Sequence, residues 1–125
     1  MISYEVYKVL HLLGVVCVFA ALGGVAVHAA NGGQRQGNVL RRVISALHGL
    51  GLLVILVAGF GLLARLQLLA DGLPLWVYGK LALWLVAGAL LVIPYRRPAA
   101  ARGTLMIGLP LLGAIAAWLA IYKPG

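Results

Sequence analysis

Four long apolar stretches, separated by short polar segments or by glycine and proline, dominate the chain. They cover residues 4–30, 43–69, 75–93 and 104–122. Each is close to or above the roughly 20 apolar residues that a helix needs to cross a bilayer. We therefore predict an all-α fold, a four-helix transmembrane bundle whose successive helices run up, down, up and down.

The composition supports a lipid environment for most side chains. Hydrophobic residues make up 64% of the 125 residues, and the mean hydropathy is +1.08. A soluble domain is closer to half apolar, and a soluble core of this size could not bury so much apolar surface. Four spans and their loops use the whole chain, so we expect residues 1–125 to form a single integral membrane domain. The first stretch is too long for a cleavable signal peptide.

The net charge of +8 comes mainly from two short loops, 31–42 and 94–103. Those loops carry six arginines and no acid: Arg35, Arg41, Arg42, Arg96, Arg97 and Arg102. This clustering indicates membrane topology rather than a nucleic-acid surface. The positive-inside rule places both loops in the cytoplasm, so both termini would be periplasmic in a bacterial inner membrane. The two acids, Glu5 and Asp71, fall on the opposite face.

One candidate site lies toward the outer face, where His11, Arg65 and Lys80 occur at similar depth. A neutral imidazole can bind haem iron, and the two cations could pair with haem propionates or with an anionic substrate. Trp76, Lys80 and Trp84 follow one another at intervals of four, so they share one helix face suited to a porphyrin wall. The alternative is that Lys80 and Arg65 reach the interface and the tryptophans belong to an aromatic belt.

A second candidate site, toward the cytoplasmic face, pairs His28 with His48 on adjacent antiparallel helices. Two such histidines could ligate a haem iron or hold a metal, although no carboxylate or thiol is near enough to complete a zinc or copper site. The alternative places His28 at the interface and hydrogen-bonds His48 to a backbone carbonyl. His11 and His28 are about 25 Å apart along one helix and cannot bind the same iron.

The opening sequence YEVYKVLHLLGVV, at residues 4–16, resembles the first helix of HemJ-type protoporphyrinogen oxidases, small four-helix membrane proteins that bind haem b. The sequence WVYGKL at residues 76–81 is similar to the W-x-x-x-K-L opening of that family's third helix. The resemblance implies that His11 is a catalytically essential haem ligand and Lys80 a functional residue. His28 matches a histidine common near the end of the first helix. Early in the second apolar stretch, His48-Gly49-Leu50 replaces the family's Pro-Gly-Met, and CopD- and SirB-like membrane proteins share the same general appearance.

Two classes of function follow. The first is a haem-b-binding redox protein that oxidises protoporphyrinogen or passes electrons to quinone, with His11 as leading axial ligand and His48 or His28 as the second. Arg65 and Lys80 would hold anionic groups. The second is a small non-catalytic accessory subunit of a larger membrane complex or oligomer, which short loops and glycine-rich helices suit. A copper or small-solute transporter fits less well, because the apolar stretches lack the necessary acids, thiols and methionines.

Overall fold

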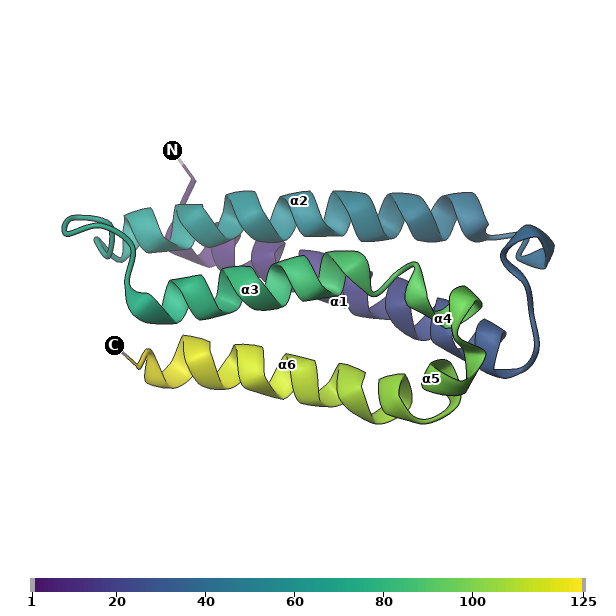
Figure 1. Ribbon diagram of the computed structural model, residues 1–125. Coiled ribbons are helices and arrows are strands. Elements are labelled where there is room, and N and C mark those ends of the chain that lie inside the picture. The colour runs from purple at the N-terminus through teal and green to yellow at the C-terminus, as the bar shows by residue number, and fades with distance from the viewer. Residues whose placement is uncertain (1, 125) are drawn as a thin grey trace.

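The computed structural model describes residues 2–124, which form helices and turns with no strand in that range. Its four longest helices are α1 (Tyr4–Ala30), α2 (Arg41–Arg65), α3 (Leu75–Ala89) and α6 (Thr104–Tyr122). Three shorter ones are η1 (Arg35–Gly37), α4 (Ile93–Arg96) and α5 (Pro98–Arg102). The long helices lie along a common direction, and η1, α4 and α5 gather at the end opposite the termini (Figure 1). The predicted all-α fold is confirmed.

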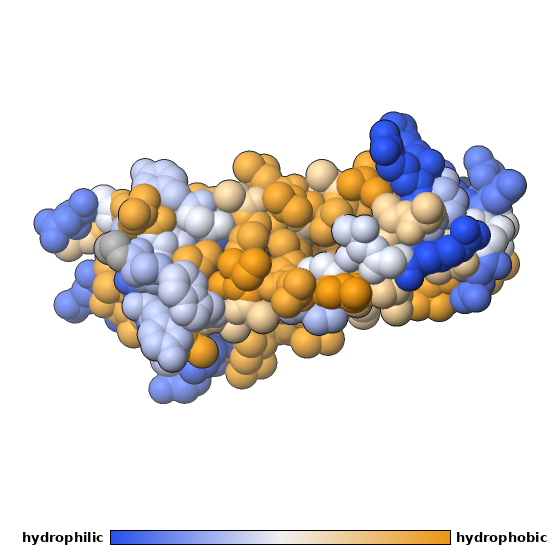
Figure 2. All heavy atoms as spheres, turned by 60° about the horizontal axis from the view of Figure 1, so that its bottom comes forward, coloured by the Kyte–Doolittle hydropathy of each residue, from blue (hydrophilic) through white to orange (hydrophobic). Residues whose placement is uncertain are grey.

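The surface has the polarity expected of a membrane protein. Helices α1, α2 and α6 are long and apolar enough to cross a bilayer, while α3, with 15 residues, is shorter. Large aliphatic side chains such as Val9, Leu50 and Ile107 are about two thirds exposed. Figure 2 shows apolar side chains around the middle of the molecule and polar ones gathered at both ends. Soluble monomers rarely expose apolar surface on this scale, so lipid is its natural solvent.

Helices α1 and α2 are in backbone contact. A Cβ atom added to Gly14 would lie 2.8 Å from the carbonyl oxygen of Gly51, closer than real Cβ contacts come. Small residues allow such an approach between membrane helices, where dispersion contacts rather than hydrophobic burial drive association. Next to this contact, Val18 and Leu22 are each 1% exposed and join a core that includes Ala87 and Leu109. This core therefore connects α1 with α3 and α6.

Helix α1 has the predicted bounds because Gly32 ends it in a left-handed conformation. The φ angle of Gly32 is +86°, its N–H donates to Ala29 O, and the Gly33 N–H donates to His28 O. These two bonds form a Schellman motif, which satisfies carbonyls that the helix end would leave unpaired.

Helix α2 ends with the same motif, four residues before the predicted end at residue 69. Gln67 has a φ of +57°, its N–H donates to Ala64 O, and the Leu68 N–H donates to Leu63 O. Leu68 also packs against the cluster that contains Leu63, the apolar contact that commonly accompanies this motif. The left-handed position of this motif usually holds glycine, but here it holds Gln67, which gives no local sign of a helix end. The predicted end at residue 69 was therefore too late.

The third predicted helix, 75–93, is interrupted. Helix α3 ends at Ala89, and the chain resumes helical structure at Ile93. Pro94 has no N–H to bond the carbonyl of Leu90, and its ring would collide with that carbonyl in a continuous helix. Pro94 instead lies in the first turn of α4, where the missing N–H costs nothing. Helix α4 lies beyond the end of α3, and α5 then leads back into α6 (Figure 1). The bounds of α6 match the predicted 104–122.

Candidate functional site

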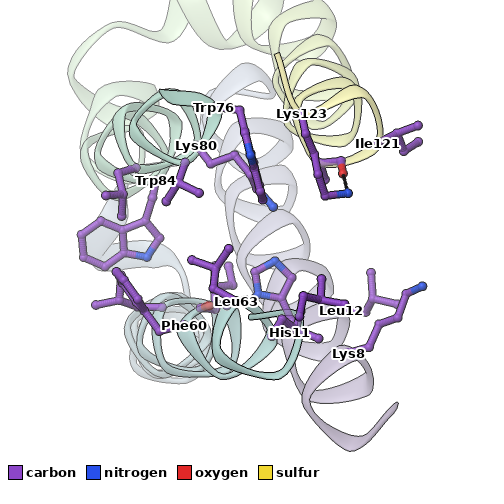
Figure 3. Close-up of a pocket in the computed structure, with 18 of the residues that line it drawn as sticks. Lys8, His11, Leu12, Phe60, Leu63, Trp76, Lys80, Trp84, Ile121 and Lys123 are labelled. Atoms are coloured by element: carbon purple, nitrogen blue, oxygen red, sulfur yellow. Dashed lines mark hydrogen bonds between the residues drawn. The ribbon is translucent and has the colours of Figure 1, made fainter. Parts of the chain in front are cut away.

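A cavity of about 410 Å³ lies at the end of the bundle near the termini, bordered by α1, α2, α3 and the end of α6. His11, Trp76, Lys80 and Trp84 all line it (Figure 3). The structure thus brings together four of the five residues assigned to the outer site. Its volume is in the range of small-molecule and cofactor pockets.

The ring of His11 is oriented by α2. Its Nδ1 lies 3.0 Å from the carbonyl oxygen of Ile55, and His11 is half-buried. A carbonyl only accepts, so Nδ1 donates the hydrogen bond and Nε2 of the neutral ring keeps its lone pair. A histidine whose second nitrogen donates to a carbonyl is typical of metal ligands. Gly59 makes room for the ring, since a Cβ there would lie 3.3 Å from His11 Cε1.

Three lysines line the cavity: Lys8, Lys80 and Lys123. No carboxylate lines it among the residues that the structure describes. The ammonium of Lys123 lies 5.6 Å from the ring centroid of Trp76, within cation–π range. The remaining lining is largely aliphatic and aromatic, so the cavity suits an anion with a large apolar body.

The two tryptophans are held in place as cavity wall. Trp84 donates its indole N–H to the carbonyl oxygen of Leu52 on α2, at 2.9 Å. Trp76 is 8% exposed and packs against Leu63 and Val77. Both rings can therefore face a ligand without first being ordered, which reduces the entropy cost of binding.

Arg65, the fifth residue assigned to the outer site, lies elsewhere. Its Nε and one terminal nitrogen donate to the carbonyl oxygen of Ile2, at 2.9 and 2.6 Å. It is not among the residues lining the cavity. Its guanidinium therefore ties the end of α2 to the N-terminal segment.

The structure does not bring His28 and His48 together. His48 is buried, and its Nε2–H donates to Ala87 O on α3 at 2.9 Å. This is the carbonyl bond given above as the alternative for His48. His28 Nδ1 lies 2.7 Å from the Tyr95 hydroxyl of α4.

The register of α1 on α2 explains this separation. Gly24 faces Ile44, and His28 and His48 each lie four residues further along helices that run in opposite directions. They are therefore about 12 Å apart along the bundle axis. No cluster of three or more His, Cys, Asp or Glu side chains occurs within residues 2–124.

Sequence reasoning left several site residues unassigned. Lys8 lies three residues before His11 and so on the same helix face, a signal that spacing alone could have supplied. Lys123 and Gly59 come from distant segments, and only the folded structure brings them to the cavity.

Comparison with protein-family models, with curated proteins and with solved structures found no match for this chain. The interpretation of the cavity therefore depends on its own geometry.

Proposed function

We propose that the protein is an integral membrane redox protein that binds haem b in the cavity beside His11. The observation that supports it best is the free Nε2 of His11 in an apolar cavity ringed by three lysines. The imidazole would ligate the iron, the lysines would pair with the propionates, and Trp76 and Trp84 would flank the macrocycle. Neither His28 nor His48 lines this cavity, so His11 is the one axial ligand proposed.

The chain's own groups would set the properties of the bound cofactor. The Ile55 carbonyl fixes the orientation of the His11 ring, so that Nε2 is directed by a bond on the opposite side of the imidazole. Lys80, half-buried on α3, would hold a carboxylate away from bulk water, and the aliphatic lining would limit water access. Haem b supplies one-electron chemistry when bound.

The resemblance of residues 4–16 and 76–81 to HemJ-type protoporphyrinogen oxidases supports a porphyrin substrate. In this proposal the donor is protoporphyrinogen, which loses six electrons and six protons to become protoporphyrin, and three membrane quinones accept them in turn. Lys80 would then be the lysine whose contact with a haem propionate matters most, because the resemblance implies a functional role for it.

The proposed topology is a four-helix transmembrane bundle, up-down-up-down, in a bacterial inner membrane. Helix α3 alone is about 22 Å long, short of the roughly 30 Å hydrocarbon core, but residues 75–96 would reach about 33 Å if counted through α4. The arginine-rich loops would be cytoplasmic and the His11 cavity would open toward the periplasm.

The absorption spectrum of the detergent-purified protein, loaded with haem, tests the cofactor. Wild type should show a Soret band and His11→Ala should lose most of it. His48→Ala is the matched control, because it removes an imidazole that does not line the cavity and should keep the band. Equal amounts of folded protein, judged by helical circular dichroism, are compared. A wild type without a Soret band, or an unchanged band in His11→Ala, contradicts the proposal.

The second candidate, a non-catalytic accessory subunit, is favoured by the exposure of α6. Only Leu105 and Leu109 of this helix are buried, and Ile107 and Ile121 are about 70% exposed. A neighbouring subunit could cover this face as well as lipid could. Mild-detergent purification that yields a stoichiometric partner and no pigment would support this role over the redox role.

A further inference from the structure

A second cavity, of about 370 Å³, lies at the opposite end of the bundle from His11. It is formed by α1, η1, the first turn of α2 and the segment from the end of α3 into α4. Its lining combines three arginines with aliphatic side chains: Arg35, Arg41 and Arg96 with Val25, Ile44 and Leu91. The break before Pro94 contributes to it, since Leu91 belongs to the interrupted segment.

The arginines at this cavity have no carboxylate partner in the described structure. The chain has two acids, and both lie at the other end: Glu5 in the first turn of α1 and Asp71 between α2 and α3. One terminal nitrogen of Arg41 approaches the carbonyls of Gln36 and Asn38 at 3.4 and 3.5 Å, long for hydrogen bonds. Most of its five N–H donors remain available, and a guanidinium fork matches phosphate oxygens.

The wall of the cavity is held by buried polar contacts. Asn38 is 9% exposed, donates to the Tyr95 hydroxyl at 3.0 Å, and accepts from the Leu40 N–H. The bond to Tyr95 connects the segment before α2 to α4, and the bond from Leu40 holds the Asn38 side chain within that segment, so Arg41 and Arg96 extend from two elements joined to each other. The lining also joins the arginine-rich connections to the ends of apolar helices, a combination expected at the level of lipid headgroups.

We propose that this cavity binds an anionic phospholipid, with the three arginines contacting the phosphate and an acyl chain following the aliphatic residues. Basic pockets between membrane helices at this level bind acidic headgroups. Free phosphate shares the headgroup chemistry, but it would gain nothing from Val25, Ile44 and Leu91. The site is separate from the His11 cavity and does not depend on haem.

Native mass spectrometry of the full chain in detergent tests the proposal, with phosphatidylglycerol and phosphatidylcholine of identical acyl chains as probes. Wild type should bind one phosphatidylglycerol in preference to phosphatidylcholine. The double variant Arg41→Gln/Arg96→Gln should weaken binding about 25-fold, about fivefold for each arginine. The matched control, Arg42→Gln/Arg97→Gln, removes the same charge from adjacent residues that do not line the cavity and should change binding less than twofold.

A single variant keeps the proposal testable if the double variant does not fold. Arg35 makes no side-chain hydrogen bond within residues 2–124, so Arg35→Gln should fold normally and still weaken phosphatidylglycerol binding about fivefold. Equal losses in the two double variants would overturn the proposal, because a diffuse surface charge would then explain binding. Equal affinity for the two lipids, or displacement of phosphatidylglycerol by inorganic phosphate at similar concentration, would also overturn it.

Discussion

At the scale of single residues, the His11 ring is confined between a hydrogen bond to Ile55 and the bare backbone of Gly59. Gly59→Ala places a methyl group 3.3 Å from His11 Cε1, so the ring must move by a few tenths of an ångström. We expect haem affinity to fall by about tenfold, as for other changes to groups that orient a metal ligand. Haem titration followed at the Soret band measures this. Gly49→Ala, on the same helix with nothing within 4 Å, should leave affinity unchanged; equal effects would contradict the assignment.

Gln67 and Gly32 occupy the same position in two copies of one helix-ending motif. A side chain in the left-handed region costs about 1–2 kcal/mol, which Gly32 avoids and Gln67 does not. Gln67→Gly should raise the free energy of unfolding by about 0.5–1 kcal/mol, after the greater flexibility of glycine in the unfolded chain is counted. Gly32→Gln should lower it by about 1 kcal/mol. Denaturant unfolding in detergent measures both, and changes of the same sign would contradict this explanation.

Sequence spacing predicted which side chains line the outer cavity better than it predicted the groups that hydrogen-bond to them. His11, Lys80, Trp76 and Trp84 share a depth or a helix face, and both properties depend only on local geometry. The acceptor of His11 is a backbone carbonyl, a group that every residue carries, so no pattern could have marked Ile55. Arg65 lies near the depth predicted for the outer site, but its side chain points to Ile2 rather than into the cavity. That direction depends on the side-chain conformation in the folded chain.

At the scale of helices, the Gly14–Gly51 contact sets how closely α1 and α2 approach. In Gly14→Ala, the new methyl would meet the Gly51 carbonyl at 2.8 Å, and backbone cannot move aside as a flexible side chain can. We expect a loss of about 1–3 kcal/mol in unfolding free energy, the usual cost of overpacking. Gly23→Ala on the same helix has nothing within 4 Å and should be neutral or stabilising, since alanine favours helix. Similar losses in both would show that packing does not limit the approach.

Helix α2 accepts side-chain hydrogen bonds from both of its neighbours. His11 of α1 donates to Ile55 O, and Trp84 of α3 donates to Leu52 O, while His48 of α2 donates to Ala87 O on α3. Each ring thus pairs its N–H with the second lone pair of a helical carbonyl, which avoids leaving a donor unpaired in an apolar interior. The Trp84 and His48 bonds both join α2 to α3, and they explain how these two helices remain aligned although their backbones approach closely at few points.

The helix bounds were predictable where a chain-breaking residue marks them. Gly32 and Gly33 end α1, and Gly103 precedes α6, so 4–30 and 104–122 were predicted correctly. The end of α2 has only helix-compatible leucines and Gln67 around it, and its motif is completed by packing that involves Leu68. The predicted end at residue 93 lies directly before Pro94, but α3 ends at Ala89, ahead of the Leu90 carbonyl that the proline ring would strike.

At the scale of the whole molecule, both ends are cationic but differ in chemistry. The end near the termini carries lysines around an imidazole, together with both acids of the chain. The other end carries six arginines without an acid. Lysine offers a compact charge, whereas arginine offers a planar fork suited to phosphate. The two cavities therefore favour different anions, a carboxylate on an apolar body at one end and a phosphate at the other.

The interrupted third helix makes the number of membrane crossings the decisive test of the architecture. Four crossings place the α5 region on the same side as η1, whereas three crossings, with α3 failing to span, place it on the side of the α2–α3 connection. Gln36, Asp71 and Ala99 are exposed and mark these three regions. Each is replaced by cysteine in a Cys17→Ala background and treated in intact spheroplasts with a membrane-impermeant maleimide.

We expect Asp71→Cys to react, and Gln36→Cys and Ala99→Cys to react only after the membrane is permeabilised. The arginines favour retention of both loops in the cytoplasm, and the break at residues 90–92 lies near that interface, where water can satisfy its free backbone groups. Labelling of Ala99→Cys together with Asp71→Cys would instead show that α3 and α4 do not cross. The cavity proposed to bind a phospholipid could then not form, since Arg41 and Arg96 would lie on opposite sides of the membrane.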